Sequence, residues 1–537
     1  MSQPNLDHIL AQLKAAQGNP QALTLATLNI VLEARGPQLR PLIEAAAIPH
    51  WFDRDILTAL LPEHAISEET FTALTALPMI EPFQGKGWNV HESTRLALRH
   101  WLAAEHPERL RQLSAHAADH FHPQPDAEVE TLYHRLLADP EHAARQVGDA
   151  CYTFQKHGRQ TELDRLGLVL AELLTLPQLP AAAEARACLH VVEIRKAYLT
   201  TEECQGLAQR ALSLFQTQEV ADGEAHAWCA LGDAALALGQ LREAEQAYQQ
   251  TKRILHDQLL VTQPDSPRWM RDLAVAHSRL GDVRMAQGQL DAAAQAFSED
   301  HAIFARLVAL DPVNTNWPRE LAVAHGKLGN VHMAQGQLDA AAQAFSEGMA
   351  ICTRLVALDP ANTGWLRGLA VAHSRLGNVH MAQGQLDAAA QAFSESMAIF
   401  TRLVVLDPAN TGWLRDLAVA HGKLGDVRME QGQLDAAAQA FSKSLAINTR
   451  LVTLDPTNSS WQYDLAITLF KLGQCYFYTG KPKAGVLLLR KAESQLSQLV
   501  QQSPDHAEWR ASLQSVRQAL RQLSPSPGKP THKPKRR

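Results

Sequence analysis

Basic, polar and thioether side chains recur in the second half of the chain at a constant spacing of 48 residues. The basic column is Arg279, Lys327, Arg375 and Lys423; the polar column is Asp282, Asn330, Asn378 and Asp426; the methionine column is Met285, Met333, Met381 and Met429. Guanidinium and ammonium groups bind carboxylates through charge-assisted hydrogen bonds. Thioether side chains repack readily against apolar partners. These residue types therefore indicate a surface that binds a protein segment.

The charged columns and the methionine column also have a purely structural interpretation. Basic and acidic residues three positions apart on a helix, such as Arg279 and Asp282, can form ion pairs worth a few tenths of a kcal/mol. The methionines can pack in the core between helices. The sequence leaves both interpretations open.

No arrangement typical of an active site accompanies these columns. The sequence contains no G-x-x-x-x-G-K-[ST] motif and no C-x-x-C pair among its six cysteines. The recurring histidines belong to separate repeats, whose helices should lie about 8–10 Å apart, whereas a zinc ion needs nitrogens within about 2.1 Å. These histidines are His277, His325, His373 and His421. We expect them to pack between helices, and we expect no enzyme activity, cofactor or metal.

A repeated helical element must carry these columns. Apolar residues recur at spacings of three and four over residues 369–380 and again over 388–406, which is typical of amphipathic helices. Gly384 lies between them, where a tight turn needs positive φ, and Asp387 begins the second helix. Asp407-Pro408 ends it. Each repeat is therefore predicted as helix, tight turn, helix and short loop. A fixed period of this size indicates stacked repeats.

These repeats resemble the tetratricopeptide repeat (TPR). Its pattern is carried in one repeat by Trp228, Leu231, Gly232, Ala244 and Tyr248, and in a later one by Leu424, Gly425, Ala437 and Phe441. The period of 48 exceeds the usual 34, and the extra residues are consistent with about two more turns per helix. The resemblance implies an all-α, right-handed solenoid over residues 206–523, with six repeats and a capping helix.

The resemblance also implies where a partner would bind. In this family the first helix of each repeat lines a concave groove, and the three columns fall on those helices. Arg375 with Asn378 resembles part of the family's carboxylate clamp. Ser374 and Gly422 stand where the clamp would have lysine, so a complete clamp is not expected.

Residues 36–122 have a different pattern. Short helices are predicted at 41–47, 52–61 and after Ser67, followed by two apolar runs around a glycine-rich turn at 84–87 and a helix at 92–104. This order, with I-P-H-W-F-D and the V-H-E step, resembles the winged-helix domain of STAND-type signalling NTPases. The resemblance implies that His91 approaches a nucleotide phosphate, if a partner chain supplies the ATPase core. The other interpretation is that His91 is structural or vestigial.

Winged helices also bind DNA. This region, however, holds seven basic and eleven acidic residues, and phosphate neutralisation supplies most non-specific DNA affinity. Nucleic acid is therefore not the expected partner.

The remaining segments are assigned more coarsely. Residues 1–35 are predicted to form two helices, Leu6–Ala16 and Gln21–Glu33. Residues 123–205 are either a helical arm or degenerate repeats. Residues 524–537 are expected to be a disordered basic tail. With a net charge of −6 and no apolar run of 18 residues, we expect a cytoplasmic protein that does not enter a membrane.

The sequence thus predicts a non-catalytic scaffold that binds a protein segment in the concave face of a TPR superhelix. The first alternative is the sensor half of a split STAND-type signalling system. The second is a winged-helix DNA-binding regulator.

Overall fold

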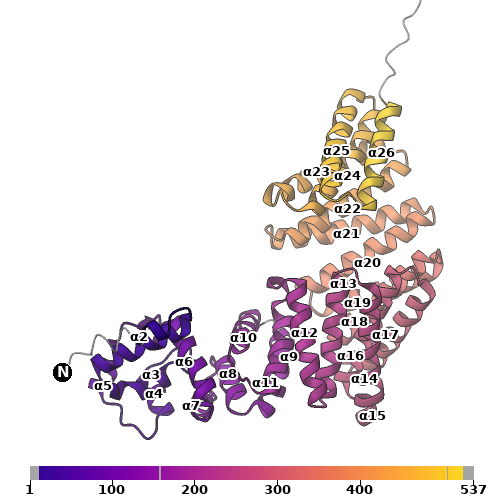
Figure 1. Cartoon of the computed structure of the whole chain (residues 1–537). Coiled ribbons are helices and arrows are strands. Elements are labelled where there is room, and N and C mark those ends of the chain that lie inside the picture. Colours follow the sequence, from indigo (N-terminus) through magenta and orange to yellow (C-terminus); the bar gives the residue numbers. More distant parts are fainter. Residues whose placement is uncertain (1–10, 12, 157–158, 505, 524–537) are drawn as a thin grey trace, which may run out of the picture. The chain divides into compact units, whose positions relative to one another are not determined.

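The computed structural model describes residues 11, 13–156, 159–504 and 506–523, and it is composed mainly of α-helices (Figure 1). The chain forms two compact units, Met1–Ala276 and His277–Arg537. Most of the predicted helix Leu6–Ala16 and the predicted disordered tail lie outside the described residues. No helix in the described part of the chain is long and apolar enough to span a membrane.

The N-terminal unit begins with short helices, a β-hairpin and two longer helices, in the order predicted from the sequence. Asp53 and Ser67 are N-caps, whose side-chain oxygens accept hydrogen bonds from Ile56 N (2.8 Å) and Thr70 N (3.1 Å). The helices are α2 (Pro20–Arg35), α3 (Arg40–Ala46), α4 (Arg54–Leu60), α5 (Glu68–Thr75), α6 (Glu92–Glu105) and α7 (Pro107–Phe121), with a 3₁₀ turn at Pro37–Leu39.

The predicted hairpin is present between α5 and α6. Strands β1 (Ile80–Phe83) and β2 (Gly87–Val90) pair antiparallel, and Phe52 extends the pairing through a bridge to Trp88. Gly87 has φ of 93°, and a Cβ atom there would lie 2.6 Å from the Phe52 carbonyl oxygen. Only glycine fits this close approach.

The helices that follow share a hydrophobic core with this region. The core extends from Leu28 through Phe121 and Tyr133 to Val191. The helices are α8 (Glu128–Ala138), α9 (Pro140–Lys156), α10 (Gln160–Leu173), α11 (Ala181–Arg195), α12 (Thr201–Thr217), α13 (Ala221–Ala237), α14 (Leu241–Ile254), α15 (Leu260–Thr262) and α16 (Pro267–Ala286), with a 3₁₀ turn at Lys196–Tyr198 and a π-helical turn at Leu255–Leu259. Helix α16 continues past Ala276 into the C-terminal unit.

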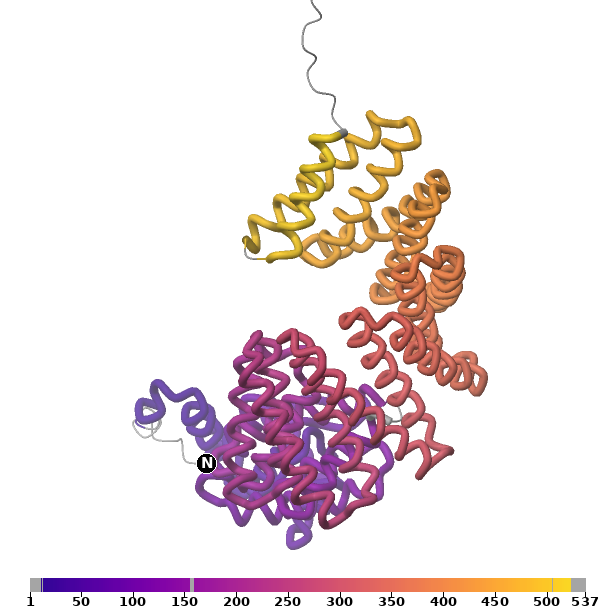
Figure 2. Tube along the Cα trace, turned by 90° about the vertical axis from the view of Figure 1, so that its right-hand side faces the viewer, coloured from indigo at the N-terminus to yellow at the C-terminus, as the bar shows by residue number. Residues whose placement is uncertain are grey.

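The C-terminal unit is a series of stacked helix pairs (Figures 1 and 2). First helices are α16, α18 (Asn316–Ala334), α20 (Thr363–Ala382), α22 (Thr411–Glu430) and α24 (Ser459–Tyr478). Second helices are α17 (Leu290–Leu310), α19 (Leu338–Leu358), α21 (Leu386–Leu406), α23 (Leu434–Leu454) and α25 (Pro482–Gln502), and α26 (Ala507–Leu523) follows. With α13 and α14 in the N-terminal unit, the six predicted repeats are all helix pairs.

Local signals define each pair. In one repeat, Asn410 is the N-cap of α22 and accepts a hydrogen bond from Trp413 N (3.0 Å). Gly432 (φ 72°) forms the turn to α23. Within the pair, Gly425 lies against the Phe441 ring, where a Cβ atom would come within 2.6 Å of the ring. The glycine therefore sets how closely the two helices pack.

Hydrogen bonds also join consecutive repeats. The amides of Gln335, Gln383 and Gln431 donate to the carboxylate 44 residues earlier, at 2.8, 2.9 and 2.8 Å. The acceptors are Asp291, Asp339 and Asp387. The aspartates thus lie in the first turn of the second helix, as predicted for Asp387, and they also bind the next repeat.

Candidate partner-binding surface

The basic column lies on the first helices, and Lys471 holds the equivalent position in the repeat after Lys423. Ion pairs at this position join consecutive repeats. Lys327 Nζ lies 2.6 Å from Asp282 Oδ2, and Lys471 Nζ lies 2.7 Å from Asp426 Oδ2. The structural interpretation placed such pairs three residues apart on one helix. The observed pairs instead span 45 residues, because neighbouring first helices lie side by side.

Cations of this column also lie over aromatic rings. The distance from the cationic group to the ring centroid is 5.4 Å for Lys327 over Phe297 and 5.9 Å for Arg375 over Phe345. Cation–π attraction of this kind contributes about 0.5–2 kcal/mol. The basic column therefore helps to hold the repeats together.

Two members of the basic column lack the ion pair. Lys327 and Lys471 each pair with an aspartate 45 residues earlier, but the residue 45 positions before Arg375 is Asn330 and the one before Lys423 is Asn378. Neither Arg375 nor Lys423 therefore has a carboxylate within 4.0 Å among the described residues. Both side chains are half-buried, and burial lowers the pKa of each. A partly desolvated cation without a counter-ion is unfavourable.

A column of valines accompanies these cations. Val323, Val371 and Val419 each precede a basic residue by four positions, so valine and cation share one helix face. Val323 and Val419 are 45% exposed. The first helices thus present apolar and cationic groups side by side.

The methionine column is half-buried at the contact between repeats. Met333 packs against a cluster that contains Phe345 of its own repeat and Val379 of the next. The other three methionines occupy equivalent places, at Met285, Met381 and Met429. These contacts favour the core-packing interpretation, and a partner would reach only the exposed part of each side chain. In the polar column, Asn330 is exposed and the other three residues are half-buried.

The histidine column packs between helices. His277, His325 and His421 are buried and His373 is half-buried. His325 Nε2 lies 3.2 Å from His301 Nε2, and burial lowers the pKa of His325. Within the described residues, no group of three or more His, Cys, Asp and Glu side chains is arranged to hold a metal ion.

A further ladder of ion pairs was not found by sequence reasoning. Arg367 Nε lies 2.8 Å from Asp416 Oδ2, and Arg415 Nε lies 2.7 Å from Asp464 Oδ2 in the next repeat. The available signal was the Arg-Asp or Arg-Glu step that begins two residues after Trp269, Trp317 and Trp413. It could not reveal that the pairs form between repeats.

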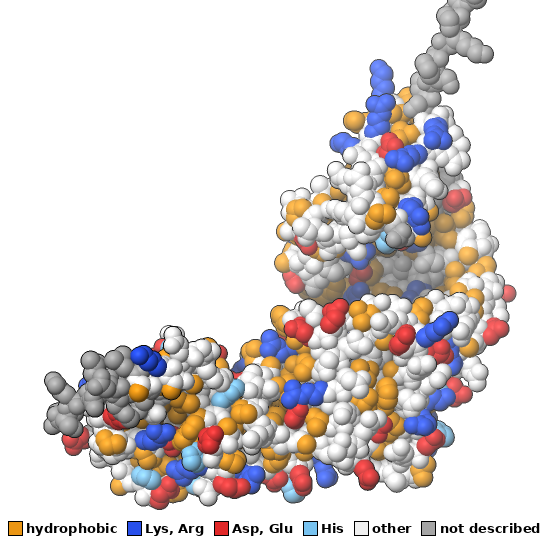
Figure 3. Space-filling model, viewed as in Figure 1, with side chains coloured by type: hydrophobic (Ala, Val, Ile, Leu, Met, Phe, Trp, Pro, Cys, Tyr) orange, Lys and Arg blue, Asp and Glu red, His pale blue; other side chains and the backbone are white. Residues whose placement is uncertain are grey.

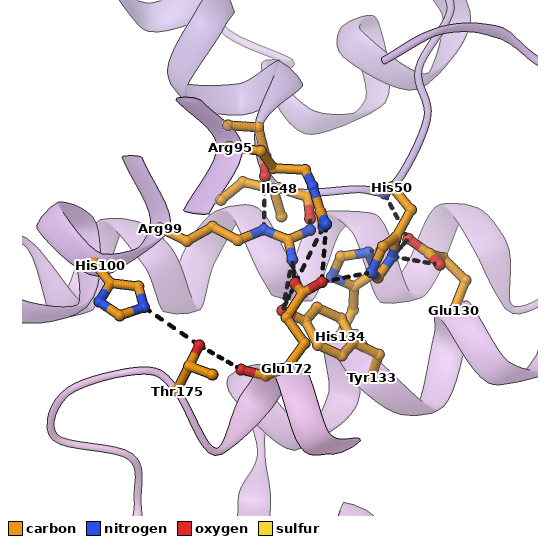
Figure 4. A network of polar contacts seen from close by, with 11 residues as sticks. Ile48, His50, Arg95, Arg99, His100, Glu130, Tyr133, His134, Glu172 and Thr175 are labelled. Carbon is orange, nitrogen blue, oxygen red and sulfur yellow. Dashed lines mark hydrogen bonds and ion pairs between the residues drawn. The ribbon is translucent and has the colours of Figure 1, made fainter. Parts of the chain in front are cut away.

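The N-terminal unit also contains a buried polar network that was not predicted from the sequence (Figure 4). The Arg95 guanidinium donates two hydrogen bonds to the Glu172 carboxylate, at 3.1 and 2.8 Å. Arg99 also donates to Glu172, and to the Ala47 carbonyl (2.7 Å) and the Tyr133 hydroxyl (2.8 Å). The network therefore ties α6 to α8 and α10.

The charge state of this network follows from its contacts. Burial opposes ionisation of Glu172, but the contact with His50 and the charges of Arg99 and Arg95 hold the pKa of Glu172 well below its ordinary value. The carboxylate is therefore ionised at neutral pH, and α6 is fixed to the following helices by charged hydrogen bonds.

His91 lies at the start of α6, directly after the hairpin. Its backbone N–H donates to the Met79 carbonyl (2.7 Å), and its Nδ1 lies 3.0 Å from Ser93 Oγ. The residue is exposed. Its role in nucleotide sensing stays a prediction.

Comparison with known proteins gives one family match. The tetratricopeptide repeat model matches residues 225–251, which include most of α13 and most of α14. No curated protein sequence matches the chain.

Solved structures give broader similarity at low sequence identity. A signal transduction ATPase with numerous domains (STAND) with a tetratricopeptide repeat sensor, from Pyrococcus horikoshii, aligns over 96% of this chain and 72% of its own, with TM-score 0.51 and 12% identity. BtubC from P. vanneervenii aligns over 55% of this chain and 98% of its own, with TM-score 0.38 and 17% identity.

The matched repeat, the six helix pairs and the glycine–aromatic contact inside five of them show that this chain contains tetratricopeptide-like repeats, which in the C-terminal unit are 48 residues long.

Proposed function

We propose that the protein is a non-catalytic scaffold that binds a partner protein segment along the first helices of its C-terminal repeats. The observation that carries this proposal is the pair of half-buried cations, Arg375 and Lys423, which have no carboxylate within ion-pair distance in the described structure. Their counterparts Lys327 and Lys471 use the same position to bind Asp282 and Asp426.

The neighbouring valines support the same proposal. A segment with acidic and apolar residues would place its carboxylates on the cations and its apolar groups on Val371 and Val419. Successive repeats would engage the same segment, and linked contacts of this kind multiply affinity. The basic, polar and methionine columns named from the sequence stay part of this proposed surface.

The charges on the face seen in Figure 3 do not favour nucleic acid. Acidic and basic side chains are interspersed over the face seen in Figure 3, without a continuous basic patch. A DNA backbone would need such a patch.

The proposal is tested by comparing partner capture from native cell extract. The Arg375→Gln, Lys423→Gln variant removes the two unpaired cations, and the Arg354→Gln, Lys443→Gln control removes two exposed cations from second helices. We expect proteins captured by the wild-type chain and the control to be lost from the first variant, with helical circular dichroism unchanged. Equal capture by both variants would contradict the proposal.

A second candidate function is the sensor part of a STAND-type signalling system. It is favoured by the alignment with the Pyrococcus horikoshii protein, which spans nearly the whole chain and therefore includes the winged-helix-like region. It predicts association with an ATPase-bearing chain that depends on ATP and weakens in His91→Ala. Association that is indifferent to both would remove this candidate.

A further inference from the structure

Among the described residues the Arg–Asp ladder forms at two steps, Arg367–Asp416 and Arg415–Asp464, and not at the two steps before them. The residue at the ladder's acidic position is Asp272, Glu320, Gly368, Asp416 and Asp464 in successive repeats. Arg319 contacts its own neighbour Glu320 at 2.8 Å, and Arg271 likewise contacts its own neighbour Asp272 at 3.4 Å although the next repeat supplies Glu320. Only Arg319 has no acidic residue at the ladder position of the next repeat, which is Gly368. The inter-repeat ion pair is thus absent at Gly368.

Two further changes occur at the same step. Position 348 is glycine, where the equivalent residues are Asp300, Ser396 and Ser444. Asn330 replaces the aspartate that would have paired with Arg375. Three losses of a polar or acidic side chain therefore coincide between α18 and α20.

These losses leave a pocket of about 220 Å³ lined by α18, α19 and α20. Its apolar wall includes Phe345, Leu355, Trp365 and Val371. Its charged residues are Arg319, Arg367 and Arg375, and none of its lining residues is acidic.

The three arginines differ in whether a carboxylate of the chain pairs with them. Arg367 is held by Asp416 (2.8 Å) and Arg319 by the partly exposed Glu320. Arg375 has no carboxylate within 4.0 Å in the described residues, and burial lowers its pKa. The pocket therefore carries uncompensated positive charge beside an apolar wall.

The equivalent step two repeats later differs in composition. The pocket there is lined by Lys423 and Lys471 together with Asp426, Asp464 and Glu508. Its carboxylates come from the chain itself. At Gly368 the chain does not supply the carboxylate, although the cations are kept.

We propose that the pocket between α18 and α20 binds an aspartate or glutamate side chain of the partner segment, with its carboxylate at Arg319 and Arg375 and a neighbouring apolar side chain against Trp365. The occupant is a side-chain carboxylate because the acidic side chain of the other repeats is what Gly368 lacks. This inference rests on the proposed function and names the partner chemistry at one site.

The test uses the full chain and a terminally blocked, fluorescein-labelled peptide of twelve alternating Leu and Glu residues. Two further probes are the blocked Leu-Gln peptide and the Leu-Gln peptide with a free C-terminal carboxylate. Fluorescence anisotropy should show that the Leu-Glu peptide binds at least about tenfold more tightly than blocked Leu-Gln, the size expected for charged hydrogen bonds. Equal affinity for these two, or preference for the free terminus, would overturn the assignment.

Gly368→Asp is the decisive variant because it restores the missing ladder residue. A Cβ atom at Gly368 meets only Cys352 Sγ at 3.6 Å, an ordinary contact, so the variant should fold. We expect it to weaken Leu-Glu binding by about tenfold or more, without lowering the urea midpoint of unfolding. Arg319→Gln and Arg375→Gln should weaken binding similarly.

Other outcomes separate this inference from the proposed function. Binding that is lost in Lys423→Gln but unchanged in Gly368→Asp would overturn the pocket and leave the scaffold proposal standing. Binding of the Leu-Glu peptide that is unaffected by Lys423→Gln, Arg375→Gln and Gly368→Asp, or no binding at all, would overturn both.

Discussion

Asp300 gives the most quantitative prediction about stability. This residue on α17 is 2% exposed, and its Oδ1 has no hydrogen-bond partner. Burial raises the pKa of Asp300 to about 7, against the ordinary value of 3.8. The equivalent residues in later repeats are Gly348 and the buried serines Ser396 and Ser444. We predict that Asp300→Ser stabilises the C-terminal unit.

The size and sign of the effect of Asp300 on the free energy of unfolding follow from its proton binding in the native and unfolded states. Between pH 3.8 and about 7 the native carboxyl keeps a proton that the unfolded chain has lost, so stability falls as pH rises. The contribution of protonated Asp300 to the free energy of unfolding is complete below pH 3.8 and is lost by about pH 7. At about 1.4 kcal/mol per pH unit, the native state loses at most roughly 4 kcal/mol. The benefit of Asp300→Ser should therefore be larger at pH 8 than at pH 5.

Urea unfolding followed by circular dichroism at pH 5 and pH 8 tests this. The difference in stabilisation between the two pH values should be about 2–3 kcal/mol. Ser396→Asp is the matched control, because it introduces the same carboxyl at a buried equivalent position and should create the same pH dependence. A gain from Asp300→Ser that is equal at both pH values would refute the reasoning.

Two further predictions concern the packing of each unit. Glu172→Gln should destabilise the N-terminal unit by about 3 kcal/mol because it leaves Arg99 buried without its counter-charge. Because the pKa of Glu172 is lowered, its contribution to the free energy of unfolding is present above pH 4.5 and is lost on acidification. The wild-type chain should therefore lose more stability than the variant between pH 5 and pH 3. Parallel losses in urea titrations would contradict this. Gly329→Ala should destabilise the C-terminal unit by about 1–3 kcal/mol, since a Cβ atom would lie 2.4 Å from the Phe345 ring. Gly422→Ala is the control, because a Cβ atom there has its nearest contact 4.0 Å away; it should be neutral or stabilising by up to about 1 kcal/mol. Similar thermal midpoints for the two variants would show that the glycine–aromatic contact does not set the helix packing.

The helices were predictable from sequence because their signals are local. Apolar spacing, the glycine turns such as Gly384 and the Asp-Pro stops act within one repeat. The hairpin at Gly85–Gly87 was predictable for the same reason. Each of these signals needs only a few neighbouring residues.

The contacts between elements were less accessible to sequence analysis. Lys327 pairs with a residue 45 positions earlier, and Arg95 with one 77 positions later. Neither separation is visible in a helical pattern. The importance of Gly368 is also hidden in the sequence, because the absence of an acidic side chain matters only once Arg319 is known to face that position.

We propose that the first helices of the C-terminal repeats bind the partner. Hydrogen–deuterium exchange of the full chain, with and without a captured partner, tests it most directly. We expect the partner to slow exchange in α18, α20 and α22, centred on Arg375 and Lys423, and to change the exchange of α19, α21 and α23 less. Protection confined to those second helices or to residues 36–122 would contradict it.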